Sequence, residues 1–210
     1  MLAMLERCFA IICAEHDDDC VYELPYEEGR AFRVSQGYGG THSHNGSSHY
    51  SLDFAMPEGT NVCAARSGVV VAMIDHNRLG GTSSQYKRMS NYVEILHQDY
   101  SVAHYAHLGH GGVHVKCGQH VKAGDVIGFS GNTGWSCFPH LHFHVVAGVY
   151  WQRVPTKFRT TFSRHAIFLR QGKRYRRPTS PNLLPVALVY HCTTFLDWLL
   201  KRLSTRRIRE

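Results

Sequence analysis

Apolar and polar positions alternate with a period of two along much of the chain between residues 50 and 150. In "YSLDFAM", residues 50–56, Leu52 and Phe54 fall on one side and Asp53 on the other. Successive side chains of a β-strand point to opposite faces, so this pattern predicts a half-buried strand.

Several more short strands follow in the sequence. "NYVEILH" and "SVAHYAHL", residues 91–97 and 101–108, predict two strands joined by a short link, as in a hairpin. "NVCAARSGVVVAMID", residues 61–75, predicts strand, tight turn and strand, and residues 112–135 are short β runs punctuated by glycines. No helical period interrupts residues 50–150, so we expect an all-β domain.

The stretch "FPHLHFHV", residues 138–145, has histidine at every second position. As a strand it turns Leu141, Phe143 and Val145 towards a core, and it carries three imidazoles on the other face: His140, His142 and His144. One face of this strand is therefore a candidate for chemistry.

Charge is distributed unevenly along the 210 residues. Residues 1–150 carry 9 Lys and Arg against 14 Asp and Glu, whereas residues 151–210 carry 14 against 2. The basic C-terminal part favours an anionic wall polymer or membrane surface as a partner, or is a solvated tail. "RYRR" has no helix or sheet context that would read bases, so nucleic acid is not the expected partner.

Composition predicts one domain with extensions. We expect an N-terminal segment (1–36), a β domain (37–154) and a basic C-terminal extension (155–210), with an amphipathic helix between residues 188 and 203. The N-terminus is a poor export signal. The seven cysteines do not settle the compartment, and a pair of Cys13 with Cys20 stays open, as does the oligomeric state.

Sixteen histidines are more than a core needs, and they suggest a metal centre. A catalytic zinc commonly has three protein ligands and a fourth position for water. His140 and His142 lie about 6.6 Å apart along a strand, so both can reach one site. His49 and Asp53 are candidates for the rest, but four extended residues span about 13 Å, so we expect His49 in a loop bent back over the strand.

Together these motifs resemble the lysostaphin-type (LytM-like) zinc metalloendopeptidases, which cut peptides of bacterial peptidoglycan. The resemblance rests on "HYSLDFAMPEGT", "YAHL", "GQHVKAGDVIGFSGNTGWS" and "PHLHF", and it covers about half of the chain. It implies zinc ligands His49, Asp53 and His142, and catalytic residues His107 and His140. It also implies a compact antiparallel, duplicated-hybrid-motif-like β fold with an open groove, one Zn²⁺ per chain and a place in the cell envelope.

The implied reaction is hydrolysis of peptide bonds in stem peptides or cross-links by a metal-activated water. The alternative is a non-catalytic wall-binding or regulatory protein of the same fold. Two departures from the family pattern stand out: bulky Phe138 lies before "PHLHF", and the nearest tyrosine upstream of His49 is Tyr38. His42 and His44 are candidates to replace a missing donor, and His44 is a competing candidate ligand.

Overall fold

The computed structural model describes residues 20–148 and 150–179. These residues form sixteen strands and two short 3-10 helices: β1 (Val21–Tyr22), β2 (Ala31–Gln36), η1 (Gly46–Ser48), β3 (Ser51–Ala55), β4 (Asn61–Cys63), β5 (Gly68–Ile74), β6 (Gly80–Gly81), η2 (Ser84–Arg88), β7 (Asn91–Leu96), β8 (Val102–Val113), β9 (His120–Val121), β10 (Val126–Ser130), β11 (Gly134–Trp135), β12 (His140–Ala147), β13 (Gln152–Val154), β14 (Lys157–Thr160), β15 (Ser163–Ile167) and β16 (Arg174–Arg176). In this part of the chain, no helix is long and apolar enough to cross a membrane.

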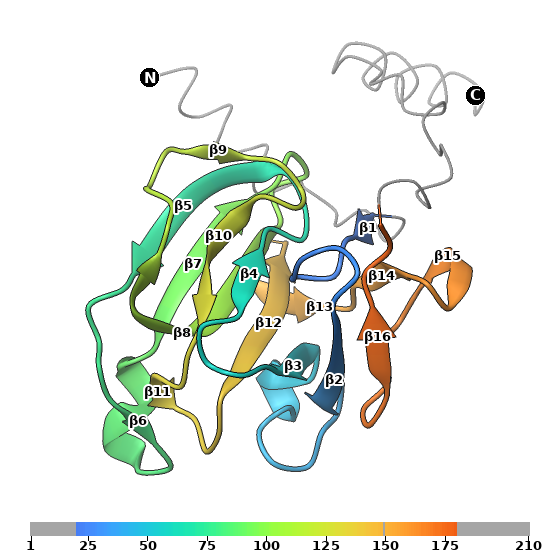
Figure 1. Cartoon of the computed structure of the whole chain (residues 1–210). Coiled ribbons are helices and arrows are strands. Elements are labelled where there is room, and N and C mark those ends of the chain that lie inside the picture. The colour runs from blue at the N-terminus through green and yellow to red at the C-terminus, as the bar shows by residue number, and fades with distance from the viewer. Residues whose placement is uncertain (1–19, 149, 180–210) are drawn as a thin grey trace, which may run out of the picture. The chain divides into compact units, whose positions relative to one another are not determined.

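One large sheet dominates the fold. Its strands follow the order β16-β2-β3-β12-β8-β7-β5-β9, with β10, β4 and β13 attached beside this path. The histidine strand β12 lies between β3 and β8 and is antiparallel to both (Figure 1). Two minor pairings, β1 with β14 and β11 with β6, are parallel. The prediction of an all-β, mainly antiparallel domain is confirmed.

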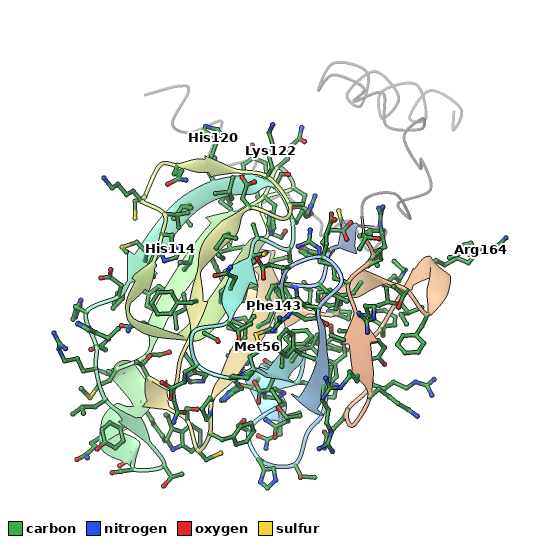
Figure 2. The ribbon with its side chains drawn as sticks, viewed as in Figure 1. Met56, His114, His120, Lys122, Phe143 and Arg164 are labelled. Carbon is green, nitrogen blue, oxygen red and sulfur yellow. The ribbon has the colours of Figure 1, made fainter. Side chains whose placement is uncertain are left out.

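The core lies against the apolar face of β12. Leu141, Phe143 and Val145 are fully buried, as the alternation predicts. The Phe143 ring meets Tyr105 at 5.2 Å and Phe158 at 5.6 Å between ring centroids, in edge-on geometry. Figure 2 shows Phe143 within the ribbon. This packing pins the register of β12 and therefore fixes which residues its opposite face presents.

Strand pairing agrees with the sequence prediction at the expected hairpin, and elsewhere it joins segments that the sequence left without partners. β7 and β8 pair as an antiparallel hairpin, as expected. By contrast, β4 pairs with β10, and β5 pairs with β7 and β9, so residues 61–75 do not form a hairpin with each other. Local sequence predicted the strands of this stretch but not their partners, which come from far along the chain.

The sheet does not break at the expected domain boundaries. β2, in the expected N-terminal segment, pairs with β3, and β16, in the expected basic extension, pairs with β2 (Figure 1). The side chain of Arg164, on β15 of the basic region, points away from the ribbon (Figure 2). The predicted helix at 188–203, the N-terminus and Cys13 lie outside the described residues.

We predict that Phe143→Ala lowers the free energy of unfolding by about 3–5 kcal/mol, because it leaves a cavity among aromatic rings. Phe162→Ala is the matched control, since Phe162 is 69% exposed, and it should change stability by about 0.5 kcal/mol or less. Urea unfolding measures both. Equal effects of the two substitutions would contradict this account of the core.

Candidate metal centre

Strand register brings the candidate residues together. On the polar face of β12, His142 lies opposite Asp53 of β3 on one side and opposite Ala106 of β8 on the other. His140 lies two residue pairs further along, opposite Ala55, and therefore on the same face as His142. Residues distant in sequence therefore share one face because three antiparallel strands are adjacent.

Three side chains converge on one point of this face. The Asp53 Oδ1 atom lies 2.8 Å from His142 Nδ1 and 3.2 Å from His44 Nε2. The three atoms all lie within 4.8 Å of one another, which is close enough for them to hold one metal ion. Two imidazoles and one carboxylate are the donor set of a catalytic zinc site that keeps a position for water.

The hydrogen bonds around His44 leave one nitrogen facing this point. His44 is 1% exposed, and its Nδ1 lies 3.1 Å from the Gly37 carbonyl oxygen. A carbonyl only accepts, so Nδ1 carries the proton and donates it. The Nε2 atom is buried without a hydrogen-bond partner and faces Asp53. A nitrogen lone pair this close to a carboxylate oxygen is favourable only with a cation or proton between them, so the residues fit a metal ion.

Gln36 orients both the carboxylate and the loop that carries His44. Its Oε1 accepts hydrogen bonds from the backbone N–H groups of His42 and Ser43, at 3.2 and 3.3 Å. Its Nε2 then donates to Asp53 Oδ2 at 3.2 Å. This bond occupies Oδ2 and leaves Oδ1 for the point of convergence.

His49 lies outside the group, although the family resemblance implies it as a ligand. It follows the η1 turn, it is exposed, and its ring packs on Tyr50 at 4.6 Å. The bent loop expected for His49 does exist, but it folds His44 over Asp53 instead. His49 has helical backbone at the end of η1, and its ring packs on Tyr50, while His44 is the buried histidine of this loop beside Asp53.

His140 and His107 lie side by side next to the three converging atoms. Their ring centroids are 4.6 Å apart, and His140 Nε2 is 3.6 Å from Asp53 Oδ1. Each Nδ1 donates to a backbone carbonyl, that of Phe138 at 2.8 Å and that of Thr133 at 2.7 Å. Both imidazoles therefore have Nε2 as the nitrogen available for proton transfer.

The backbone at His107 adopts a left-handed conformation, with φ of 64°. The Ser90 hydroxyl accepts the His107 backbone N–H at 3.0 Å, and Gly131 N–H donates to the His107 carbonyl at 2.9 Å. A Cβ at Gly134 would lie 2.7 Å from the Ser90 Cα, so glycine is needed there. This non-glycine left-handed residue is held by several contacts, as strained backbone at functional sites commonly is.

Burial and neighbouring charges shift the pKa values of the group. Burial lowers the pKa of His107 to about 3, with help from His140 and His142. Burial also lowers the pKa of His142 to about 4, against the attraction of Asp53. For Asp53, burial would raise the pKa, but the surrounding imidazoles outweigh it and hold the pKa well below its usual value. At neutral pH Asp53 is therefore a carboxylate and His142 a neutral imidazole, which are the states that metal ligation requires.

The two departures noted in the sequence have clear positions. The Phe138 ring lies 5.1 Å from the His140 ring and is 41% exposed, so it borders the catalytic candidates. The Tyr38 hydroxyl accepts the Thr156 backbone N–H at 2.8 Å. Tyr38 therefore holds the segment between β13 and β14, and it is not among the residues that converge with Asp53.

Supporting residues had little signal in the sequence. Ser90, Thr133 and Ser136 contact the histidines through hydroxyls or carbonyls, and no spacing marks them. His44 had a signal, because "HNGSS" is a turn sequence next to a candidate ligand. His44 was nevertheless only a competing candidate in the sequence, whereas in the structure it is the histidine of this loop that lies beside Asp53.

Comparisons with known proteins agree with this chemistry. The sequence profile of Peptidase family M23 matches residues 47–154, which are 108 of the 210 residues. Peptidoglycan DD-endopeptidase ShyA of Vibrio cholerae is 41% identical over 98 residues, 47% of this chain and 20% of that protein. Lysostaphin of Staphylococcus simulans is 42% identical over 99 residues, 47% of this chain and 18% of that protein.

The chain thus spans about a fifth of the length of these relatives. The solved structure of the M23 metalloprotease pseudoalterin matches with a TM-score of 0.50 at 18% identity, over 75% of this chain and 95% of that one, and this likeness shows the fold alone. The family match includes His49, Asp53, His107, His140 and His142, and it begins after His44.

We predict that the metal-free protein loses stability as the pH falls from 7 to 5. His107 and His142 stay neutral when folded, with pKa values near 3 and 4, but take up protons near pH 6.5 when unfolded. The unfolded state therefore binds more protons, and each residue costs about 2 kcal/mol over this range. Urea unfolding in the presence of a chelator measures the loss.

His107→Gln tests the source of this pH dependence. The substitution should remove about half of the pH dependence that the two residues produce together. An unfolding free energy that is flat between pH 7 and 5 would show that these imidazoles are not buried in their neutral form.

Proposed function

Because the chain belongs to Peptidase family M23, we propose that it is a zinc-dependent endopeptidase that hydrolyses peptide bonds of peptidoglycan, in stem peptides or cross-links. The observation that carries this proposal is the convergence of His44, Asp53 and His142 beside two further imidazoles. A non-catalytic protein of the same fold would not need His107 and His140 held with Nε2 available.

The proposed zinc ligands are His44 Nε2, Asp53 Oδ1 and His142 Nδ1. His44 takes the place that the family resemblance gives to His49, because His44 is the histidine of the loop that is buried beside Asp53. Asp53 and His142 keep the roles that the resemblance implies. Two neutral imidazoles and one carboxylate leave a bound Zn²⁺ with a net charge of +1.

A zinc ion in this site would act as a Lewis acid that acidifies water and polarises a peptide carbonyl. The chain's own residues would supply proton transfer. Because the Nδ1–H group of each ring donates to a backbone carbonyl, His140 and His107 can each accept a proton at Nε2 and afterwards donate it. A protonated Nε2 can also stabilise the oxyanion of the tetrahedral state or deliver a proton to the leaving amine.

The substrate class and location rest on the relatives' names. ShyA is named a peptidoglycan DD-endopeptidase. Lysostaphin matches a segment of this chain of nearly the same length, at a similar identity. With peptidoglycan as the proposed substrate, the proposed location is the cell envelope, periplasmic or extracellular. The proposal includes a contact of the basic region from residue 155 with an anionic wall polymer or a membrane surface.

The direct test uses purified, zinc-loaded full-length protein and isolated sacculi of defined cross-link chemistry. Mass spectrometry of the released fragments should show new peptide termini, and a chelator should abolish their release. Zinc-loaded protein that binds sacculi without cutting them would instead support the non-catalytic alternative.

We predict that His44→Ala abolishes retention of zinc during dialysis, whereas His49→Ala retains one zinc per chain. Loss of a ligand should weaken zinc binding by more than about 100-fold, because even supporting residues contribute about 10- to 100-fold. Metal analysis after dialysis and a chelator competition measure both variants. The reverse result would restore His49 as the ligand and remove His44 from the site.

We further predict that His140→Ala lowers turnover by about 10²- to 10⁴-fold while zinc stays bound, because His140 transfers protons and is not a ligand. Metal content and cleavage of sacculi are measured on the same preparation. Zinc loss that parallels the loss of turnover would mean that His140 is a ligand instead.

A further inference from the structure

The third histidine of β12, His144, contacts the proposed metal ligand next to it on the same face. His144 Nδ1 lies 3.2 Å from His142 Nε2, and the two rings meet edge-on with centroids 5.3 Å apart. No role in the proposed reaction requires His144. The contact nevertheless involves the His142 nitrogen that does not face Asp53.

The chemistry of an imidazole ligand explains why this contact matters. His142 Nδ1 faces Asp53 Oδ1 at 2.8 Å, so this nitrogen must offer its lone pair if a metal binds there. A neutral imidazole then carries its proton on Nε2 and needs an acceptor for it. His144 Nδ1 is the acceptor within hydrogen-bond distance.

The two ring nitrogens of His142 have the reverse surroundings from those of the other histidines of the site. His44, His107 and His140 each donate Nδ1–H to a backbone carbonyl. His142 lies in the middle of a strand that pairs on both sides, where backbone carbonyls are used by the sheet. A side-chain acceptor takes the place of a carbonyl there.

The ring of His144 is itself held in position. It stacks on His104, its cross-strand partner on β8, with centroids 4.8 Å apart and planes inclined by 29°. His104 Nδ1–H donates to Glu94 Oε1 at 3.0 Å, and the His104 ring also lies against Tyr92. Glu94 fixes His104, and the stacked His104 limits rotation of His144.

We propose that His144 is a positioning residue for the metal centre: it accepts the His142 Nε2–H and thereby holds His142 in the tautomer and orientation that present Nδ1 to zinc, with His104 and Glu94 as its support. This inference rests on the proposed zinc site, but it does not depend on which substrate is cut, or on whether any is.

The test measures zinc affinity of the full-length protein by competition with a chromophoric chelator. His144→Ala should raise the dissociation constant for zinc by about 10- to 100-fold, because the proton on Nε2 loses its acceptor. His144→Asn places an amide oxygen near the former Nδ1 position and should stay within about 3-fold of the unmodified protein. His120→Ala is the matched control, since His120 is exposed on β9, which pairs with β5 and not with β12.

Long-range ¹H–¹⁵N spectra of the histidine rings supply a readout that a purely structural role would not move. In the zinc-loaded protein, His142 should carry its proton on Nε2. Unchanged affinity in His144→Ala, an equal loss in His144→Asn, or a His142 proton on Nδ1 would each overturn the inference.

The test separates this inference from the proposed function. Normal zinc binding by the unmodified protein together with no cleavage of sacculi would remove the proposed function and leave the inference standing. Unmodified protein that binds no zinc would overturn both.

Discussion

The constraint on which the site depends is the register of three antiparallel strands. Burial of Phe143 and its neighbours on one face of β12 fixes which residues appear on the other face. A slip by one residue would turn every histidine of this strand into the core. With the register fixed, His142 comes opposite Asp53, and electron-rich atoms gather where only a cation or a proton makes their approach favourable.

Hydrogen bonds from the surrounding structure then set the chemical role of each imidazole. Carbonyl acceptors at Gly37, Thr133 and Phe138 force the proton onto Nδ1 of three histidines and leave Nε2 available. His142 is reversed, because its Nε2 meets another imidazole. The proposed difference between the metal ligands and the residues that transfer protons thus lies in their position relative to Asp53, while neighbours that carry no charge set which ring nitrogen holds the proton.

Much of the fold and part of the site could be predicted from sequence. The alternation in "SLDFA" and "HLHFHV" predicted two strands with polar faces, because the period of two is a local property. It placed Asp53 on the polar face of one strand and His140 and His142 on the polar face of the other, but the pairing that brings these two faces together was not predicted by the period. Which of His44 and His49 lies beside Asp53 could not be predicted in this way, because it depends on how the loop from Gly37 to Tyr50 folds. Gln36, on the preceding strand, hydrogen-bonds both to this loop and to Asp53. Likewise, pairing of β4 with β10 depends on distant segments.

Diffraction from crystals of the zinc-loaded protein, recorded at the zinc absorption edge, tests the proposed metal centre most directly. We predict one anomalous peak per chain, about 2.0–2.2 Å from His44 Nε2, Asp53 Oδ1 and His142 Nδ1, with a further position open to solvent. A peak coordinated by His49, or by His142 through Nε2, would contradict it, as would crystals that hold no zinc at this point.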